Sequence, residues 1–338
     1  MKSRNIIFTK VNTAELLEQS YPTPSDNQVT VKLDVSTISS GTERANITGS
    51  KTVSWATKEQ ETAIFPRRLG YSSAGIVYEV GRGVTKFKPG DRVALSWSTH
   101  SEFCTVPETN VHHIDEIPSE EAALFHIATF PLAAIRKCKL EIGESAIVMG
   151  LGILGLIAVK LLKLAGAAPI VAVDPNPEKR ELAIKYGADY AFDPFDEGFA
   201  SEVKSVTHGG ANVGIEVTGI GAGLDGILDC MARFGRVALL GCTRDSNFTI
   251  DYYRKVHGPG VTLVGAHTMA RPQGSSSDGW WTEWDDMEAL IKLSKLKRLS
   301  LFDMVEEIHS PVEAGEIYTR LATEKTFPVV QFDWRKLK

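Results

Sequence analysis

The sequence contains few cysteines and no paired cysteine motif. Its four cysteines stand at positions 104, 138, 230 and 242 of 338 residues, and no C-x-x-C spacing occurs. Such a pattern argues against a disulfide framework and against a structural zinc lobe held by four cysteines. We therefore expect reduced and mostly buried thiols.

Excess charge and long hydrophobic runs are also missing. The net charge is −5 and no polybasic run occurs, which argues against a nucleic acid or a membrane surface as partner. Lys160 and Lys163 interrupt the most apolar stretch, residues 152–166, so it predicts a helix of a globular protein and no membrane span. The N-terminal segment lacks the apolar centre of a signal peptide. We expect a cytoplasmic protein whose partner is a small-molecule substrate.

The first third of the chain predicts short β-strands. In residues 28–36, apolar side chains at every second position alternate with polar ones, which is typical of a half-buried strand. We predict strands at residues 4–10, 28–36, 73–81, 91–97 and 101–107. A glycine-centred turn, Ser39 to Glu43, follows the second of these. From residue 119 the pattern changes to a helix over 119–138 with Ser119 as its N-cap.

The following region alternates strands with helices. We predict strands at 145–150, 169–174, 213–219, 235–241 and 261–265, with helices at 153–166 and 176–187. Continuous apolar strands alternating with helices are typical of a parallel sheet covered on both faces. A Gly/Ser-rich loop, a helix over 281–296 and a strand over 327–332 complete the chain.

A dinucleotide site is predicted at the first of these strand–helix junctions. Gly150, Gly152 and Gly155 have the G-x-G-x-x-G spacing between a strand and a helix, and Asp174 ends the next strand. The glycines permit a tight turn, close approach of a pyrophosphate and helix–strand packing, and the acid binds the adenosine ribose. Because the Asp174 carboxylate repels a 2′-phosphate, NAD is favoured over NADP. We also assign to the cofactor Thr129, Ile153, Leu154 and Thr218.

The whole pattern resembles the medium-chain dehydrogenase/reductase superfamily, which includes alcohol and polyol dehydrogenases. Residues 65–95 follow that family's signature segment, including Gly70, Gly75 and the sequence Pro89-Gly90-Asp91. The resemblance implies a GroES-like β-barrel catalytic domain at residues 1–127 and 267–338. It further implies a Rossmann doubly wound parallel-sheet domain at 128–266, a cleft between the two, and a homodimer or homotetramer.

The chain departs from this family at the catalytic zinc ligands. By the resemblance, Ser40 stands at the position of the first cysteine ligand, Tyr71 at that of the histidine, and His126 near that of the third ligand. Zinc binds Cys, His or carboxylate groups, so we expect no metal site. The hydroxyl-rich turn also resembles a zinc-lacking branch that includes bacteriochlorophyllide dehydrogenases.

Without zinc, protein hydrogen bonds must stabilise the substrate oxygen and accept its proton. The candidate catalytic residues are Ser40, Thr42, Tyr71 and His126. The resemblance puts Thr42 at a hydroxyl relay position, and Ser40 fills the vacated ligand space. Histidine titrates near neutral pH, so His126 is the predicted proton acceptor, although its apolar neighbours also fit a buried core residue.

The loop after residue 265 supplies candidate substrate residues, namely His267, Arg271 and Trp280. Aromatic faces beside cationic groups suit a sugar, polyol or anionic substrate. Trp284 instead falls at helical spacing with Met287 and is predicted to be core. We expect His112 and His113 at the surface and assign them no role.

The sequence thus predicts an NAD-dependent, zinc-independent dehydrogenase that transfers a hydride between NAD and a secondary alcohol of the polyol, sugar or cyclitol class. Two alternatives fit the same residues. One is an NADPH-type quinone or enoyl reductase, and the other is a non-catalytic NAD(H)-binding pseudoenzyme.

Overall fold

The structure is a computed structural model that describes residues 2–50, 52–53, 65–243 and 245–337. Contacts divide the chain into two compact units, Met1–Ile127 with Met287–Lys338, and Ala128–Asp286. The first boundary coincides with the predicted domain boundary. Residues 267–286, which the prediction gave to the GroES-like domain, lie in the second unit in this division. No helix among the described residues is long and apolar enough to cross a membrane.

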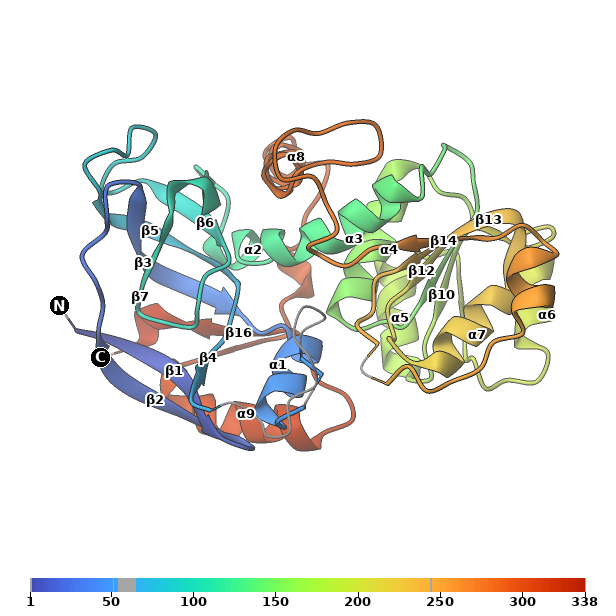
Figure 1. The fold of residues 1–338 in the computed structure, drawn as a ribbon, viewed down its shortest axis with the longest axis horizontal. Coiled ribbons are helices and arrows are strands. Elements are labelled where there is room, and N and C mark those ends of the chain that lie inside the picture. Colours follow the sequence, from blue (N-terminus) through green and yellow to red (C-terminus); the bar gives the residue numbers. More distant parts are fainter. Residues whose placement is uncertain (1, 51, 54–64, 244, 338) are drawn as a thin grey trace. The chain divides into compact units, whose positions relative to one another are not determined.

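The first unit is built mainly from antiparallel strands (Figure 1). One sheet has the strand order β15-β16-β3-β5-β6-β8, with β7 also paired to β3, and a smaller sheet has the order β2-β1-β4. Their strands are β1 Lys2–Lys10, β2 Thr13–Ser20, β3 Gln28–Thr37, β4 Arg67–Arg68, β5 Ser72–Val80, β6 Arg92–Ser96, β7 Phe103–Pro107, β8 Val111–His113, β15 Glu307–His309 and β16 Val330–Asp333. The strands predicted in the first third of the chain all occur here.

The predicted alternation of β3 turns one face of the strand into the core. Val29, Val31 and Leu33 are buried and pack with Phe8, Phe332 and others in a single apolar cluster. Burial of each such side chain stabilises the fold by about 1.5–3 kcal/mol. The helix α9, Ala314–Thr323, adds Tyr318 to this cluster.

The glycine-centred turn predicted after β3 is the beginning of a short helix, α1, Ser40–Ile47. Ser39 precedes it, and the Glu43 N–H donates to the Ser39 carbonyl at 2.9 Å. The Glu43 carboxylate in turn accepts the Ser39 N–H at 2.8 Å. This return bond from side chain to backbone supplies a partner at the helix start that the turn residues alone do not indicate.

The helix predicted over 119–138 is interrupted. It forms as α2, Ser119–Ala122, and α3, Phe125–Lys137. Ser119 is inside α2 and not its N-cap, because its hydroxyl donates to the Asp34 carboxylate at 2.8 Å. The interruption follows the Ala123 carbonyl, which accepts hydrogen bonds from the hydroxyls of Thr37 and Ser72.

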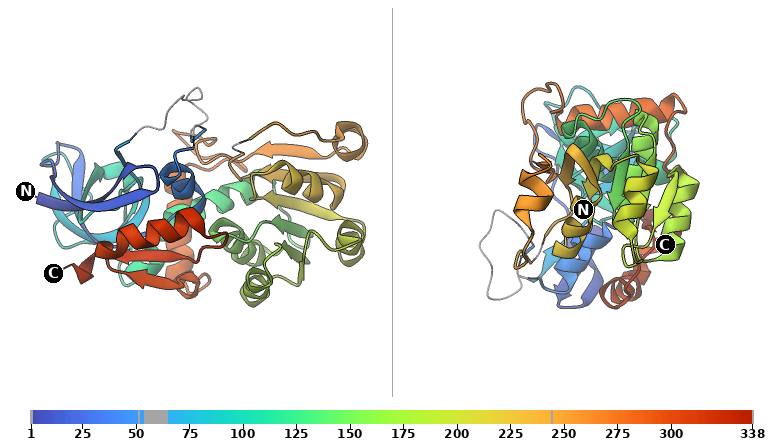
Figure 2. Two further views of the ribbon diagram at one scale, coloured as in Figure 1. Left: turned by 90° about the horizontal axis from the view of Figure 1, so that it is seen from below. Right: turned by 90° about the vertical axis from the view of Figure 1, so that its right-hand side faces the viewer.

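The second unit contains a parallel sheet with the strand order β11-β10-β9-β12-β13-β14. Helix α4 packs beside α5, and α6 beside α7, on this sheet (Figure 1). Its elements are β9 Ala146–Met149, α4 Ile153–Ala165, β10 Ile170–Val173, α5 Pro177–Tyr186, β11 Tyr190–Phe192, α6 Phe199–Val206, β12 Ala211–Glu216, α7 Gly221–Asp229, β13 Met231–Leu239 and β14 Thr262–Gly265. In Figure 2, β14 is the orange strand at the sheet edge. The last long helix, α8, spans Glu283–Lys295.

The strand order is that of a Rossmann fold, in which the chain reverses direction across the sheet between β9 and β12. Local signals explain its helices. Asn176 caps α5 by accepting the Glu178 N–H at 2.8 Å, and Pro177 occupies its first position. Gly187 ends α5 with a φ of +117°. Ligands of such sheets bind where the strand order reverses.

Candidate functional site

The glycine-rich turn lies between β9 and α4, where the strand order reverses. Gly150 has a φ of +98°, and a side chain there would lie 2.9 Å from the methyl group of Thr218, after β12. A side chain at Gly155 would lie 1.9 Å from the Gly150 carbonyl. In front of Gly152 a Cβ would meet no atom within 4 Å. The first and third glycines thus permit packing, whereas the second leaves open space.

That open space suits a phosphate group. Gly152 is the N-cap residue of α4, without a side-chain cap hydrogen bond, and the first turn of α4 carries no acidic residue. Backbone N–H groups and the helix dipole make such a terminus favourable for anions. Ile153 and Leu154 begin this helix, as predicted for residues beside the cofactor. The predicted residues therefore fit a dinucleotide.

Asp174 is half-buried at the carboxyl end of β10 and contacts the glycine-rich turn directly. Its carboxylate accepts the Leu151 N–H at 2.8 Å and the Asn176 N–H at 2.9 Å. An ionised carboxylate has about four lone-pair sites, so acceptor capacity remains for ribose hydroxyls. The sequence analysis missed Arg180 here, which donates to the Asp174 carbonyl at 2.7 Å and to the Asp193 carboxylate at 3.1 Å.

Glu216, at the end of β12, is a second acid that the sequence analysis missed. It is buried, and burial raises the pKa of its carboxyl even though Thr218 and Gly219 donate hydrogen bonds that lower it. The backbone N–H of Thr218 donates to Glu216 Oε1 at 2.7 Å, and the Thr218 hydroxyl donates to the same oxygen. Glu216 thereby orders the turn that packs against Gly150.

In the first unit, candidate catalytic residues from two segments meet. The Tyr71 hydroxyl, just before β5, donates a hydrogen bond to Ser39 Oγ, just before α1. Ser40 and Thr42 follow in the first turn of α1 and are half-buried. The structure thus brings Tyr71 to the hydroxyl-rich turn, and the hydroxyl it contacts is that of Ser39, a residue without an assigned role in the prediction.

Aromatic rings surround His126 in the first turn of α3. His126 is fully buried, and the Tyr71 ring lies edge-on to it with 5.5 Å between the ring centroids. The Trp97 ring, after β6, also lies edge-on at 4.8 Å. Trp97 is 38% exposed and has a φ of +55°, a conformation that costs energy for a bulky residue and is found more often at functional sites. No motif in the sequence marked Trp97.

Two family models match the chain in the same order as its two units. Residues 25–123 match the alcohol dehydrogenase GroES-like domain, and residues 154–289 match the zinc-binding dehydrogenase domain. L-threonine 3-dehydrogenase of Rhizobium rhizogenes is 30% identical over 60% of this chain and 67% of the relative. The chain belongs to the medium-chain dehydrogenase/reductase superfamily.

Other members of the superfamily match over more of the chain. L-threonine 3-dehydrogenase of Pyrococcus horikoshii is 26% identical over 90% of this chain and 93% of its own length. The crystal structure of galactitol-1-phosphate dehydrogenase from Escherichia coli covers 98% of this chain and 99% of its own, with 19% identity and a TM-score of 0.82. The GroES-like barrel and Rossmann fold expected from the sequence are confirmed.

The three predicted substrate residues of this superfamily member lie in the second unit as divided by contacts. Arg271 is buried, and its guanidinium donates to the Thr268 carbonyl at 2.8 Å and to the Thr129 carbonyl at 3.3 Å. It also lies 3.6 Å from the Asp286 carboxylate. These contacts connect the loop to α3 and leave Arg271 with a structural task of its own.

The other two residues differ in exposure. Trp280 is 42% exposed, and the ammonium of Lys137 lies 5.1 Å from its ring centroid. Burial and the nearby Arg271 charge lower the pKa of Lys137 to about 8. His267 is half-buried, and its Nδ1 accepts the Met269 N–H at 3.1 Å. Trp280 is thus the member of this set with the largest free face.

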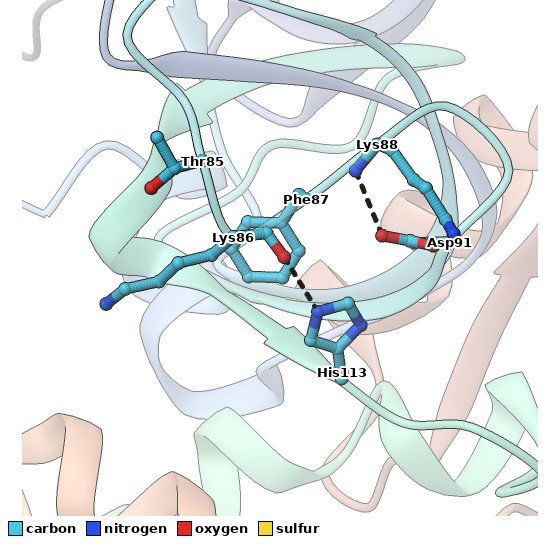
Figure 3. Close-up of a pocket in the computed structure, with 6 residues that line it drawn as sticks. All are labelled: Thr85, Lys86, Phe87, Lys88, Asp91 and His113. Atoms are coloured by element: carbon cyan, nitrogen blue, oxygen red, sulfur yellow. Dashed lines mark hydrogen bonds between the residues drawn. The ribbon is translucent and has the colours of Figure 1, made fainter.

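The remaining histidines and cysteines give one correction. His112 is buried and not at the surface, because it lies within β8 and its Nδ1 meets the Glu288 carboxylate at 2.7 Å. His113 is exposed, stacks on Phe87, and lines a shallow hollow with Lys86 and Lys88 (Figure 3). Of the cysteines, 104, 138 and 230 are buried, and Cys242 is exposed. Within the described ranges, no group of three or more His, Cys, Asp or Glu side chains gathers as a metal site.

Proposed function

We propose that the chain is an NAD-dependent dehydrogenase of secondary alcohols that works without a catalytic zinc. The observation that carries the proposal is the meeting of the Tyr71 and Ser39 hydroxyls beside the His126 and Trp97 rings. Dehydrogenase names among the relatives, including those for L-threonine and butanediol, support an alcohol as substrate.

The second unit supports NAD as the cofactor. The open backbone at Gly152 and the uncapped start of α4 would hold the pyrophosphate, and Asp174 would accept the ribose hydroxyls. A 2′-phosphate would meet the negative charge of Asp174 at close range, which disfavours NADP. When bound, NAD accepts the hydride that leaves the alcohol carbon.

The residues at the aligned metal positions do not fit zinc. Ser40 and Tyr71 offer neutral hydroxyls, whereas zinc prefers thiolate, imidazole and carboxylate ligands. Glu43 is the nearest carboxylate in the hydroxyl-rich turn, and it is already engaged with Ser39, His100 and Tyr318. We therefore derive no step through a metal ion.

We assign the work of the metal to side chains of the first unit. The hydroxyls of Tyr71 and Thr42 orient the substrate oxygen, and Ser40 fills the space beside them. His126 accepts the hydroxyl proton. Because the rings of Tyr71 and Trp97 lie against the buried His126, one of them must turn aside for this transfer. The half-exposed Trp97 face suits the C–H surface of a sugar, polyol or cyclitol.

A panel of secondary alcohols tests the proposal. We expect NAD reduction, followed by absorbance, with at least one of L-threonine, (R,R)-2,3-butanediol, sorbitol and myo-inositol. Removing one hydroxyl that stabilises a developing charge costs about 100-fold in kcat, so Y71F should lose about that much. H126Q should lose the acid limb of the pH–rate profile.

The matched control is Y78F, which removes an exposed tyrosine hydroxyl of the same barrel. It should leave kcat unchanged. NAD binding without turnover of any alcohol would favour the pseudoenzyme, and NADPH oxidation by a quinone would favour the reductase. Full activity of H126Q at every pH would remove the assigned role of His126.

A further inference from the structure

His100 connects the two segments that carry the candidate catalytic hydroxyls. It is 1% exposed, and its Nε2 lies 3.1 Å from the carboxylate of Glu43, in the first turn of α1 beside Thr42. Its backbone N–H donates to the Leu69 carbonyl at 2.8 Å. A side chain at Gly70 would lie 2.9 Å from the His100 ring, so that ring packs directly on the residue before Tyr71.

The hydrogen bonds around His100 run in one direction when the imidazole is neutral. The Trp334 indole N–H, which is only a donor, donates to Ser36 Oγ at 2.9 Å. The Ser36 hydroxyl then donates to His100 Nδ1, 2.7 Å away. This leaves the proton on Nε2, where it is donated to Glu43. Sequence reasoning could not find this chain, because its members come from distant parts of the sequence.

Glu43 is the acceptor at the end of this network. The Tyr318 hydroxyl donates to Oε2, the oxygen that also faces His100, and the Ser39 N–H donates to Oε1 at 2.8 Å. Burial and the Glu43 charge hold the pKa of Tyr318 well above its usual value, so it remains a donor. A buried network whose polar groups all have partners specifies one arrangement.

We infer that His100 and Glu43 are positioning residues that fix the distance between Tyr71 and the Ser39–Thr42 turn. Glu43 holds Ser39, which is the residue that accepts the Tyr71 hydrogen bond. His100 holds Glu43 on one side and contacts the Leu69–Gly70 backbone on the other. The structural part stands alone, while its catalytic consequence rests on the proposed function.

Hydrogen exchange measured by mass spectrometry tests the structural part without any substrate. In H100L, peptides from residues 38–47 and from residues 67–75 should both exchange about ten-fold faster, because a buried bond to a charged group is lost. H100Q retains a donor near the Nε2 position and should stay close to wild type. E43Q, which keeps the volume of Glu43, should accelerate both segments and serves if H100L does not fold.

The matched control is H112L. It removes another buried imidazole that faces a carboxylate, Glu288, in the same unit but outside both segments. It should accelerate neither peptide. Equal exchange in H100L, E43Q and wild type, or acceleration of only one segment, would overturn the inference.

Kinetics test the catalytic consequence with the panel alcohol that wild type oxidises fastest. A displacement of about 1 Å can cost about 100-fold in rate, so H100L should lower kcat by about that factor. NADH affinity should stay within about two-fold, since Asp174 and the glycine-rich turn belong to the other unit. Unchanged kcat despite faster exchange would refute the positioning role. Absence of turnover in wild type would instead count against the proposed function, while the exchange data still decide the structural part.

Discussion

Asp174 shows how one side chain combines a structural and a binding task. Its two oxygens accept N–H groups from Leu151 in the glycine-rich turn and from Asn176 at the start of α5. Its charge would also face the adenosine ribose of a bound dinucleotide. Arg180 binds the Asp174 carbonyl and Asp193, so its charge is used within the same loop. Cofactor choice in this chain is therefore argued from the single carboxylate of Asp174.

We expect D174A to bind NADH at least about ten-fold more weakly, because hydrogen bonds to a charged group are lost. Its affinity for NADPH should fall less or rise, since the repulsion of the 2′-phosphate disappears. Fluorescence titration with both reduced cofactors measures the ratio. The control D189A removes an aspartate at the other end of β10, where it accepts the Ile170 N–H at 2.7 Å. An unchanged NADH-to-NADPH ratio in D174A would contradict the assignment.

At the scale of elements, strand β15 is joined to α9 by a cluster of charges. His309, the last residue of β15, has its Nε2 2.8 Å from Glu307 and its Nδ1 2.8 Å from Glu313. Arg320 of α9 donates to both oxygens of Glu307, at 2.8 Å and 3.0 Å. The Arg320 hydrogen bonds, with help from His309, lower the pKa of Glu307 to about 2. This cluster should make the stability of the junction depend on pH.

Partial burial lowers the pKa of His309, but hydrogen bonds and charges from Glu313 and Glu307 outweigh it, and the net shift is upward. A raised pKa means that the stabilisation is complete below the unfolded value of about 6.5 and is lost as pH rises through the folded value. H309Q should therefore lower Tm more at pH 6 than at pH 9. The difference should correspond to less than about 1 kcal/mol, because the pairs are partly exposed.

Thermal unfolding of wild type and H309Q at both pH values measures this effect. The control is H113Q, whose Nε2 meets the Lys86 carbonyl rather than a carboxylate (Figure 3). A Tm difference for H309Q that grows with rising pH would have the wrong sign and would exclude the carboxylate pair as its cause.

At the scale of the whole molecule, the two units carry different chemistry. The Rossmann unit contains the glycine-rich turn and Asp174, and the barrel unit contains Tyr71, Thr42 and His126. The family model for the Rossmann unit is named for zinc binding, yet the aligned positions of the barrel carry hydroxyls. The homodimer or homotetramer expected from the family resemblance stays a prediction.

Metal analysis of untagged protein, purified without chelators, tests zinc independence. We expect well below one zinc per chain, because Ser40 and Tyr71 are not zinc ligands. Treatment with a chelator should change neither Tm nor NADH affinity. Close to one zinc per chain, removed by the chelator together with activity, would mean that an unrecognised ligand set exists and that the proposed mechanism is wrong.

The sequence by itself determined the features that depend on neighbouring residues. Alternating side chains predicted β3 and β5, and the glycine spacing with Asp174 predicted the dinucleotide turn, since strand period and turn geometry are local. Capping chemistry also predicted α5, where Asn176 and Gly187 lie at its ends. The family resemblance, carried by residues 65–95, extended these local signals to the two domains.

Tertiary structure alone decided which distant residues meet. The hydroxyls of Thr37 and Ser72 converge on the Ala123 carbonyl, and the predicted single helix is interrupted there. Trp97 joins His126, and His100 joins Glu43, although no spacing in the sequence connects either pair. A buried polar group must find a partner wherever the fold brings one within reach, and that partner is chosen by packing of the whole chain rather than by the residues beside it.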